Sequence, residues 1–147
     1  MTAKDYLLQI PTLRNRIAQQ CSLVDDYLDE ACRATSRLRS VAISGTGNHS
    51  RVETYVNKLI DREREQIDPL RRQLWQIEQD VLRVTAAMPE GKWRQVIELR
   101  YLKGCAWKDV ATACGHEIDW AFKLHGHALI AFAQTRNRLG IDNILLT

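Results

Sequence analysis

The chain has 147 residues, of which 27% are charged and 45% hydrophobic, and its formal net charge is +3 at pH 7. This length suits one or two small domains with a packed core, and the weak charge neither requires nor excludes a nucleic-acid partner. No apolar run approaches the length of a membrane span, and the N-terminus lacks the apolar core of a signal peptide. We therefore expect a cytoplasmic protein without a membrane partner.

The first forty residues repeat apolar side chains in steps of three and four, which predicts a long amphipathic helix with a coiled-coil-like seam. Pro11 interrupts the pattern, so either the helix begins there or an earlier turn from Asp5 is kinked. Cysteines of a cytoplasmic protein are expected to be reduced, and we expect Cys21 and Cys32, on or beside the seam, to be buried thiols. The seam consists of Ile10, Ile17, Cys21, Val24, Leu28, Ala31 and Leu38.

Residues 41–50, with two glycines and three hydroxyl side chains, predict a loop. A second long amphipathic helix follows, in which Pro69 predicts a kink or a short break near Asp68. Its apolar positions are Val52, Val56, Leu59, Ile67, Leu70, Leu74, Ile77, Val81, Val84 and Met88.

Two amphipathic helices joined by a short loop predict an antiparallel, coiled-coil-like hairpin over residues 1–88. A lone hairpin buries only one face of each helix. The remaining apolar edge is expected to meet either another copy of the chain or the C-terminal region. The pattern favours self-association, so we expect a homo-oligomer formed through this hairpin.

In the last third of the chain the spacing of the apolar residues changes and predicts three further helices. We therefore expect the whole chain to be all-α. A short helix from Trp93 to Leu102 is ended by Gly104, where a left-handed residue costs little. A second short helix runs from Trp107 to Cys114, and a longer third helix runs from Ile118 to Ala133.

Gly115 is expected to turn the chain between the last two helices, because glycine tolerates positive φ. Ala111 is small enough for two backbones to approach closely, and Ala121 and Leu124 are spaced to face inward. Together these features predict a helix-turn-helix DNA-binding domain over residues 89–147.

The segment ELRYLKGCAWKDVATACGHEIDWAFKLHGHAL, residues 98–129, resembles the region-four helix-turn-helix of bacterial sigma factors. The residues that carry this likeness are Arg100-Tyr101, Gly104, Asp109-Val110-Ala111, Gly115 and Ala121.

Most of the chain also resembles a sigma-factor-like family of unknown function, encoded by phages and prophages of Gram-positive bacteria and grouped near phage late-gene regulators of the ArpU and RinA type. This likeness implies a transcription regulator in the cytoplasm of a bacterial host, with promoter DNA or host RNA polymerase as partners. Glu117 replaces the usual serine of that family, and Asp119 and His127 replace frequent arginines. The matching residues are Tyr6-Leu7, Arg16-Ile17, Lys58-Leu59-Ile60-Asp61, Ile67-Asp68, Leu70, Leu99 to Leu102, Gly104, Trp107, Val110-Ala111, Gly115, Trp120, Leu124-His125-Gly126 and Ala128-Leu129.

By analogy with region four, exposed residues at the start of the third helix face the major groove. Lys123 can contact a phosphate or a guanine edge, Asp119 can accept from a cytosine amine, and Phe122 can touch a thymine methyl group. Trp120 is expected either along the DNA backbone or against the first helix of the domain. The candidate DNA-binding residues are Lys108, Ile118, Asp119, Trp120, Phe122, Lys123 and His127.

Several neighbouring residues have competing interpretations. Arg100 is a candidate for phosphate contact, but an ion pair with Asp109 or Glu98 is favoured. Lys92 and Arg94, near the start of the first domain helix, are further candidates for phosphate contact. Gly126 is expected to be a packing notch for another backbone, because glycine inside a helix is costly, with His125 hydrogen-bonded nearby.

A metal site is not expected, because no CxxC pair is present and His116 lacks the second histidine of the zinc-protease motif. No cofactor is expected, and no nucleophile motif or glycine-rich phosphate loop supports an enzyme. Two hypotheses remain. The first is a phage-type regulator that binds duplex DNA but, lacking sigma region two, cannot act alone as a sigma factor. The second is a non-enzymatic assembly or adaptor protein, small-terminase-like or polymerase-binding, that keeps the fold with weak or no DNA affinity.

Overall fold

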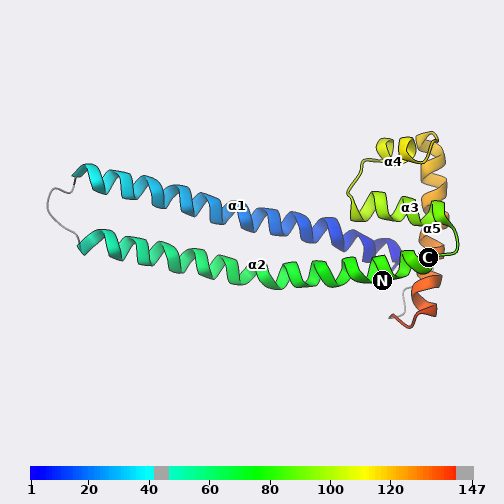
Figure 1. Cartoon of the computed structure of the whole chain (residues 1–147), viewed down its shortest axis with the longest axis horizontal. Helices are drawn as coiled ribbons and strands as arrows, with labels where there is room; N and C mark the ends of the chain where they lie inside the picture. Colours follow the sequence, from blue (N-terminus) through cyan, green and yellow to red (C-terminus); the bar gives the residue numbers. More distant parts are fainter. Residues whose placement is uncertain (42–46, 142–147) are drawn as a thin grey trace. The chain divides into compact units, whose positions relative to one another are not determined.

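The computed structural model describes residues 1–41 and 47–141, and within these parts the chain is all-α, with five α-helices and one π-helical segment (Figure 1). None of the helices that it describes is long and apolar enough to cross a membrane. The elements, in chain order, are α1 (Ala3–Val41), α2 (Gly47–Ala87), α3 (Gly91–Ile97), the π-helical η1 (Glu98–Leu102), α4 (Trp107–Ala113) and α5 (Ile118–Arg138).

The chain divides into two compact units, at places other than the expected boundary after residue 88. The hairpin unit comprises Arg14–Gln73. The five-helix unit comprises Met1–Leu13 together with the chain from Leu74 onward. Both ends of the expected hairpin therefore belong to the C-terminal unit, because their apolar residues are buried in its core.

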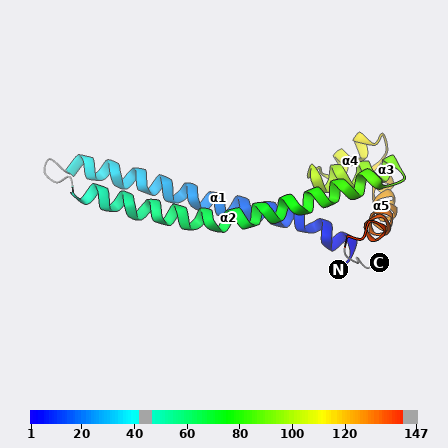
Figure 2. The same cartoon turned by 60° about the horizontal axis from the view of Figure 1, so that its bottom comes forward.

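In the hairpin unit, α1 and α2 lie side by side and antiparallel, as both views show (Figures 1 and 2). Its core is thin: Val24, Ile60 and Ile67 are buried, and their neighbours are only partly buried. The seam position Leu28 is exposed, as is Cys32, whose burial was expected, and Cys21 is half-buried. The seam residues Leu38 and Val52 lie outside the described side chains. Those partly buried neighbours are Ile17, Cys21, Tyr27 and Val56.

Both long helices differ in extent from the expectation. Helix α1 begins at Ala3, because Thr2 and Asp5 form a capping box in which each side chain accepts a bond from the other's backbone amide, at 3.1 Å. Helix α2 begins at Gly47, so the loop expected over residues 41–50 is wrong at its C-terminal end, whereas residues 42–46 lie outside the described part. Helix α2 also continues through Pro69 without the expected break.

The core of the five-helix unit is built from every one of its helices. Phe132 of α5 is fully buried and lies with its ring 6.5 Å from that of Tyr6 of α1. Thr85 of α2 donates a hydrogen bond of 3.0 Å to the Glu98 carboxylate. The largest fully buried apolar side chains are Leu7, Ile10, Val81, Val84, Val96, Ile97, Val110 and Phe132.

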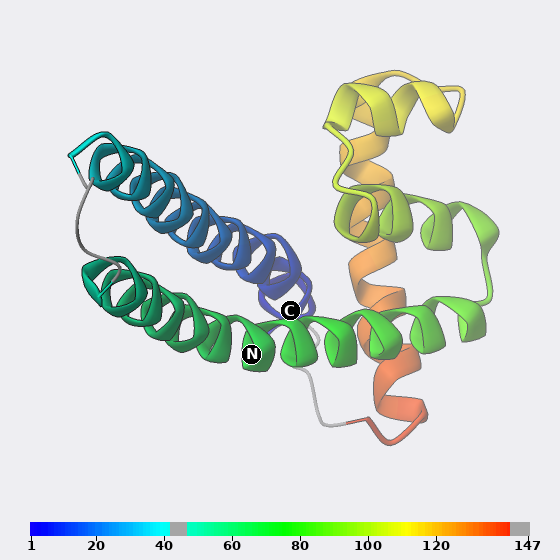
Figure 3. The ribbon, with the colours of Figure 1, turned by 60° about the vertical axis from the view of Figure 1, so that its left-hand side comes forward.

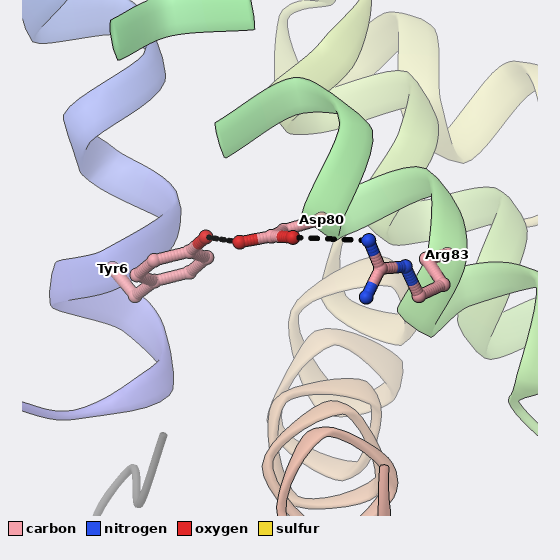
Figure 4. A network of polar contacts seen from close by, with 3 residues as sticks. All are labelled: Tyr6, Asp80 and Arg83. Carbon is pink, nitrogen blue, oxygen red and sulfur yellow. Dashed lines mark hydrogen bonds and ion pairs between the residues drawn. The ribbon is translucent and has the colours of Figure 1, made fainter. Parts of the chain in front are cut away.

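Tyr6 also connects α1 to α2 through polar contacts (Figure 4), and to α5 through a cation–π contact. Its hydroxyl donates a bond of 3.2 Å to Asp80, whose other oxygen lies 3.9 Å from Arg83 Nη2. The buried guanidinium of Arg136 lies 3.9 Å from the centre of the Tyr6 ring. Burial raises the pKa of Tyr6 to about 12, so its hydroxyl remains protonated and available as a donor.

Candidate nucleic-acid interface

The turn between α4 and α5 occupies four residues, from Cys114 to Glu117. Gly115 adopts φ = 74°, and Gly104, at the end of η1, adopts φ = 69°, which confirms the two turns predicted for these glycines. The amide of His116 donates to the carbonyl of Ala111 at 2.9 Å, and that of Gly115 donates to Thr112 at 3.1 Å. This pair of bonds is a Schellman motif, which ends α4 and redirects the chain into α5.

Small residues occupy the place where α4 and α5 meet. Ala111 of α4 and Ala121 of α5 are both buried, with Ala121 fully inaccessible, and the neighbouring Val110 is also buried. Alanine is small enough to allow two helix backbones to approach closely at this turn. Both α3 and α4 pack against α5 and cross it steeply, as Figure 3 shows. Helix α5 is longer than expected, because it continues past Ala133 to Arg138.

The expected DNA-contacting face of α5 is exposed in its first two turns. Ile118 and Phe122 are 42% and 47% exposed, and Asp119 and Lys123 are also exposed. His127 lies exposed one turn further on, and Lys108 of α4 is exposed as well. Glu117, which stands before α5, makes no side-chain capping bond, in agreement with its expected weakness as a cap.

Trp120 is the one candidate that is half-buried. Its ring stacks on His116 with ring centres 3.7 Å apart, and Lys92 Nζ of α3 lies 5.5 Å from its centre. Of its two expected positions, the structure favours the one against the first domain helix. Of the two further candidates for phosphate contact, Lys92 lies over the ring of Trp120, and Arg94 donates a hydrogen bond of 3.4 Å to the carbonyl of Ala86.

An aromatic cluster that the sequence analysis did not identify supports Phe122. The ring of Phe122 meets Trp107 edge to face, with centres 5.2 Å apart and planes at 66°. Trp107 also meets His125 at 4.7 Å and 70°. Arg100 lies 4.8 Å from the Trp107 ring centre and donates a bond of 2.9 Å to the carbonyl of Cys105. Arg100 thus packs within the domain through Trp107 and the Cys105 carbonyl, and not through the expected ion pair with Asp109 or Glu98.

His125 completes this cluster through Tyr101. Its Nε2 and the Tyr101 hydroxyl are 2.8 Å apart, which confirms the expected nearby hydrogen bond. Burial lowers the pKa of His125 to about 4, with the charges of Lys4 and Arg100 adding to the effect. Burial also raises the pKa of Tyr101 to about 12. At neutral pH the pair is thus an uncharged hydrogen bond. The π-helical segment that holds Arg100 and Tyr101 was not foreseen, because one widened turn leaves no clear mark on hydrophobic spacing.

Gly126 is not a packing notch for another helix of this chain, which corrects the expectation that the hairpin packs against it. It is exposed, and a Cβ atom added to it would meet nothing within 4 Å. Because the site is open and helical, we expect Gly126→Ala to stabilise the five-helix unit by about 0.5–1 kcal/mol. Chemical denaturation of the two proteins measures this difference. A destabilised variant would show that the backbone at Gly126 is in close contact after all.

The histidines of the five-helix unit are engaged with aromatic rings or lie on the surface. Among the residues that the structure describes, no three His, Cys, Asp or Glu side chains gather at a possible metal position. Comparison of the chain with protein-family models, with curated proteins and with solved structures finds no match. The family resemblance therefore remains a prediction that depends on the residues quoted for it.

Proposed function

We propose that the chain is a phage- or prophage-type transcription regulator that binds duplex DNA through α4, the Gly115 turn and α5. In this proposal α4 and α5 form a helix-turn-helix of the sigma region-four kind, and α5 enters the major groove. The hairpin unit holds two copies together or docks a partner such as host RNA polymerase. No enzymatic step is required of any residue.

One observation supports this proposal most strongly. A sharp turn leaves the first two turns of α5 exposed, although the opposite side of the same helix is buried through Ala121, Ala128 and Phe132. A helix of this kind can place several side chains against base edges without losing its packing. Ile118, Asp119, Phe122 and Lys123 are the residues that would reach the groove, and Lys108 would reach a phosphate.

The charge near this face predicts a modest dependence on salt. Lys108 and Lys123 are exposed there, but so are Asp109, Glu117 and Asp119. Few phosphates would be neutralised. The logarithm of the affinity falls linearly with the logarithm of the salt concentration, with a slope that is proportional to the number of neutralised phosphates, so this slope would be small. Base contacts, rather than the phosphate backbone, would then supply much of the specific binding.

Substitution of Lys123 tests the proposed contact directly. Fragments bound by the chain are selected from phage and host genomes, and the affinity for one fragment is measured over a range of salt concentrations. If Lys123 contacts a phosphate, Lys123→Gln should weaken binding to all sequences and reduce the salt slope by about 1. If it contacts a guanine, the loss should be about 1–3 kcal/mol and confined to one position.

The matched control removes the same charge elsewhere. Lys58 is exposed on α2 in the hairpin unit, so Lys58→Gln changes the net charge equally without touching α5. Its affinity and salt slope should stay close to those of the unaltered protein. Equal losses in the two variants would show that only the overall charge matters, and would contradict a contact by Lys123.

The alternative is a non-enzymatic assembly or adaptor protein with weak or no DNA binding. It is favoured by the apolar character of the exposed α5 face, where Ile118, Phe122 and Ile130 are all 42–48% exposed, since exposed apolar surface often marks a protein interface. A chain that binds no duplex even at low salt, but retains a protein partner through Phe122, would support this alternative.

Self-association is one of the two roles proposed for the hairpin unit. Its buried core is thin, and large apolar or aromatic side chains remain on its surface, at Leu23, Leu28 and Tyr55. Such residues gain from burial against a second copy. Sedimentation of the full chain, and of a Leu23→Ser, Leu28→Ser variant, measures this. A monomer at all concentrations contradicts the proposed oligomer without affecting the DNA proposal.

A further inference from the structure

Phe122 is exposed to solvent, and its ring also contacts a neighbouring aromatic ring. Its side chain is 47% exposed, yet its ring is held against Trp107 in an edge-to-face contact, with centres 5.2 Å apart. A phenylalanine on an open helix face would move among several rotamers. The contact with Trp107 restricts Phe122 to an orientation in which part of the ring stays open to solvent.

Trp107 can hold Phe122 because Trp107 itself is fixed from two sides. Arg100 lies over its ring at 4.8 Å, and the guanidinium of Arg100 is anchored by the bond to the Cys105 carbonyl. His125 meets the same ring edge to face, and the Tyr101 hydroxyl holds His125 at 2.8 Å. This group, which we call the Trp107 cluster, contains Arg100, Tyr101, Trp107 and His125.

The cluster joins three elements at the base of the exposed face. Arg100 and Tyr101 come from η1, Trp107 is the first residue of α4, and His125 comes from α5. Each of its aromatic and cation–π contacts contributes only a modest stabilisation. Because they converge on the ring of Trp107, together they hold that ring in place. Fixing a contact residue in advance reduces the entropy lost on binding.

We infer that Phe122 is a specificity-determining residue that recognises the 5-methyl group of thymine in duplex DNA, and that the Trp107 cluster positions it for this contact. The inference rests on the proposed DNA-binding function and adds the chemical feature that is read. In the major groove the thymine methyl is the one apolar group that a base edge presents. Ile118, one turn earlier on α5 and also exposed, extends the apolar surface alongside it.

The experiment replaces thymine by deoxyuridine, one position at a time, in a duplex that the chain has been shown to bind. This exchange removes only the methyl group and leaves every hydrogen-bonding atom of the base in place. For at least one position we expect the affinity to fall about fourfold, the amount that corresponds to one buried methyl group. Exchange of thymines that Phe122 does not contact should leave the affinity unchanged.

Three variants connect this discrimination to the residues. Phe122→Ala should bind the thymine duplex more weakly and should no longer distinguish thymine from deoxyuridine. Trp107→Leu, and the milder Trp107→Phe, should leave Phe122 in place but reduce the discrimination, because its orientation is released. Ile130→Ala is the matched control, since Ile130 is equally exposed on α5 but lies two turns beyond Phe122, and it should keep the full discrimination.

The outcomes are distinguishable. Absence of binding to any duplex overturns the proposed function, and the inference with it. Binding that is indifferent to deoxyuridine at every position overturns the inference alone. Discrimination that survives Phe122→Ala shows that another residue reads the methyl group. Unchanged discrimination in a folded Trp107→Phe and Trp107→Leu protein, verified by thermal unfolding, overturns the positioning role of the Trp107 cluster.

Discussion

Replacement of Phe132 by alanine is expected to lower the free energy of unfolding of the five-helix unit by about 3–5 kcal/mol. Phe132 is fully buried in α5 and its ring packs on Tyr6, so the change removes the largest of the fully buried side chains. The loss combines the transfer of the aromatic ring from water with the cavity that remains. It would be measured by urea denaturation, with the signal of the tryptophans followed.

The control for this prediction is Ile130→Ala on the same helix. Ile130 is 48% exposed and should contribute less than about 1 kcal/mol, as surface substitutions usually do. If the two variants unfold at the same urea concentration, the orientation of α5 in the structure is wrong. Because α5 also carries the proposed DNA-contacting residues, that result would remove the basis of the proposed interface.

Acidification is expected to destabilise the protein through His125. Its pKa in the folded protein is lowered to about 4, mainly by burial and then by the charges of Lys4 and Arg100, from the ordinary value of 6.5. Between these two values the unfolded chain binds a proton that the folded protein does not. The contribution of His125 to stability therefore falls as the pH drops from about 6.5 to about 4, and changes little outside this window.

A comparison with His125→Gln isolates this effect from the titration of carboxylates. The amide of glutamine is uncharged at every pH and can still bond to the Tyr101 hydroxyl. Because His125 is partly exposed, solvent screening reduces the expected difference to about 1–2 kcal/mol between pH 7 and pH 4. Denaturation curves at several pH values give the two profiles. Parallel profiles for the two proteins would contradict the burial of a neutral imidazole beside Tyr101.

Much of the helical architecture follows from local features of the sequence. Apolar spacing predicts the long helices, and Gly104 and Gly115 predict the turns at which the backbone adopts positive φ. The extents of the helices are less predictable. The capping box at Thr2 and Asp5 starts α1 earlier than Pro11 suggests, and α2 continues through Pro69. At the start of α1 the capping box outweighs the local signal against helix.

Contacts between distant segments could not be predicted in the same way. Hydrophobic spacing shows which residues share a helix face, but not which other helix covers that face. It therefore could not show that Leu7 and Ile10 belong with the C-terminal helices rather than with the hairpin. The same reason applies to Gly126, whose presence in a helix suggested a close neighbour that the structure does not contain.

Of the candidate interface, only the exposed residues of α5 could be predicted from the sequence. The exposure of Asp119 and Lys123 follows from their position on the face of α5 opposite Ala121, because each is two residues away from it. The contacts that support Phe122 could not be predicted in this way. They join Arg100, Trp107 and residues of a second helix, and no periodic pattern in the sequence encodes them.

The central claim, that α5 reads duplex DNA, is tested most directly by a selection experiment. Fragments of phage and host genomes are incubated with the full chain at low salt, the bound fragments are sequenced, and their affinities are measured as salt is added. The proposal predicts a shared sequence element, bound more weakly as salt increases and bound more weakly by Lys123→Gln and Phe122→Ala than by the unaltered protein. Failure to enrich any sequence, with no duplex bound at low salt by a folded protein, would contradict it.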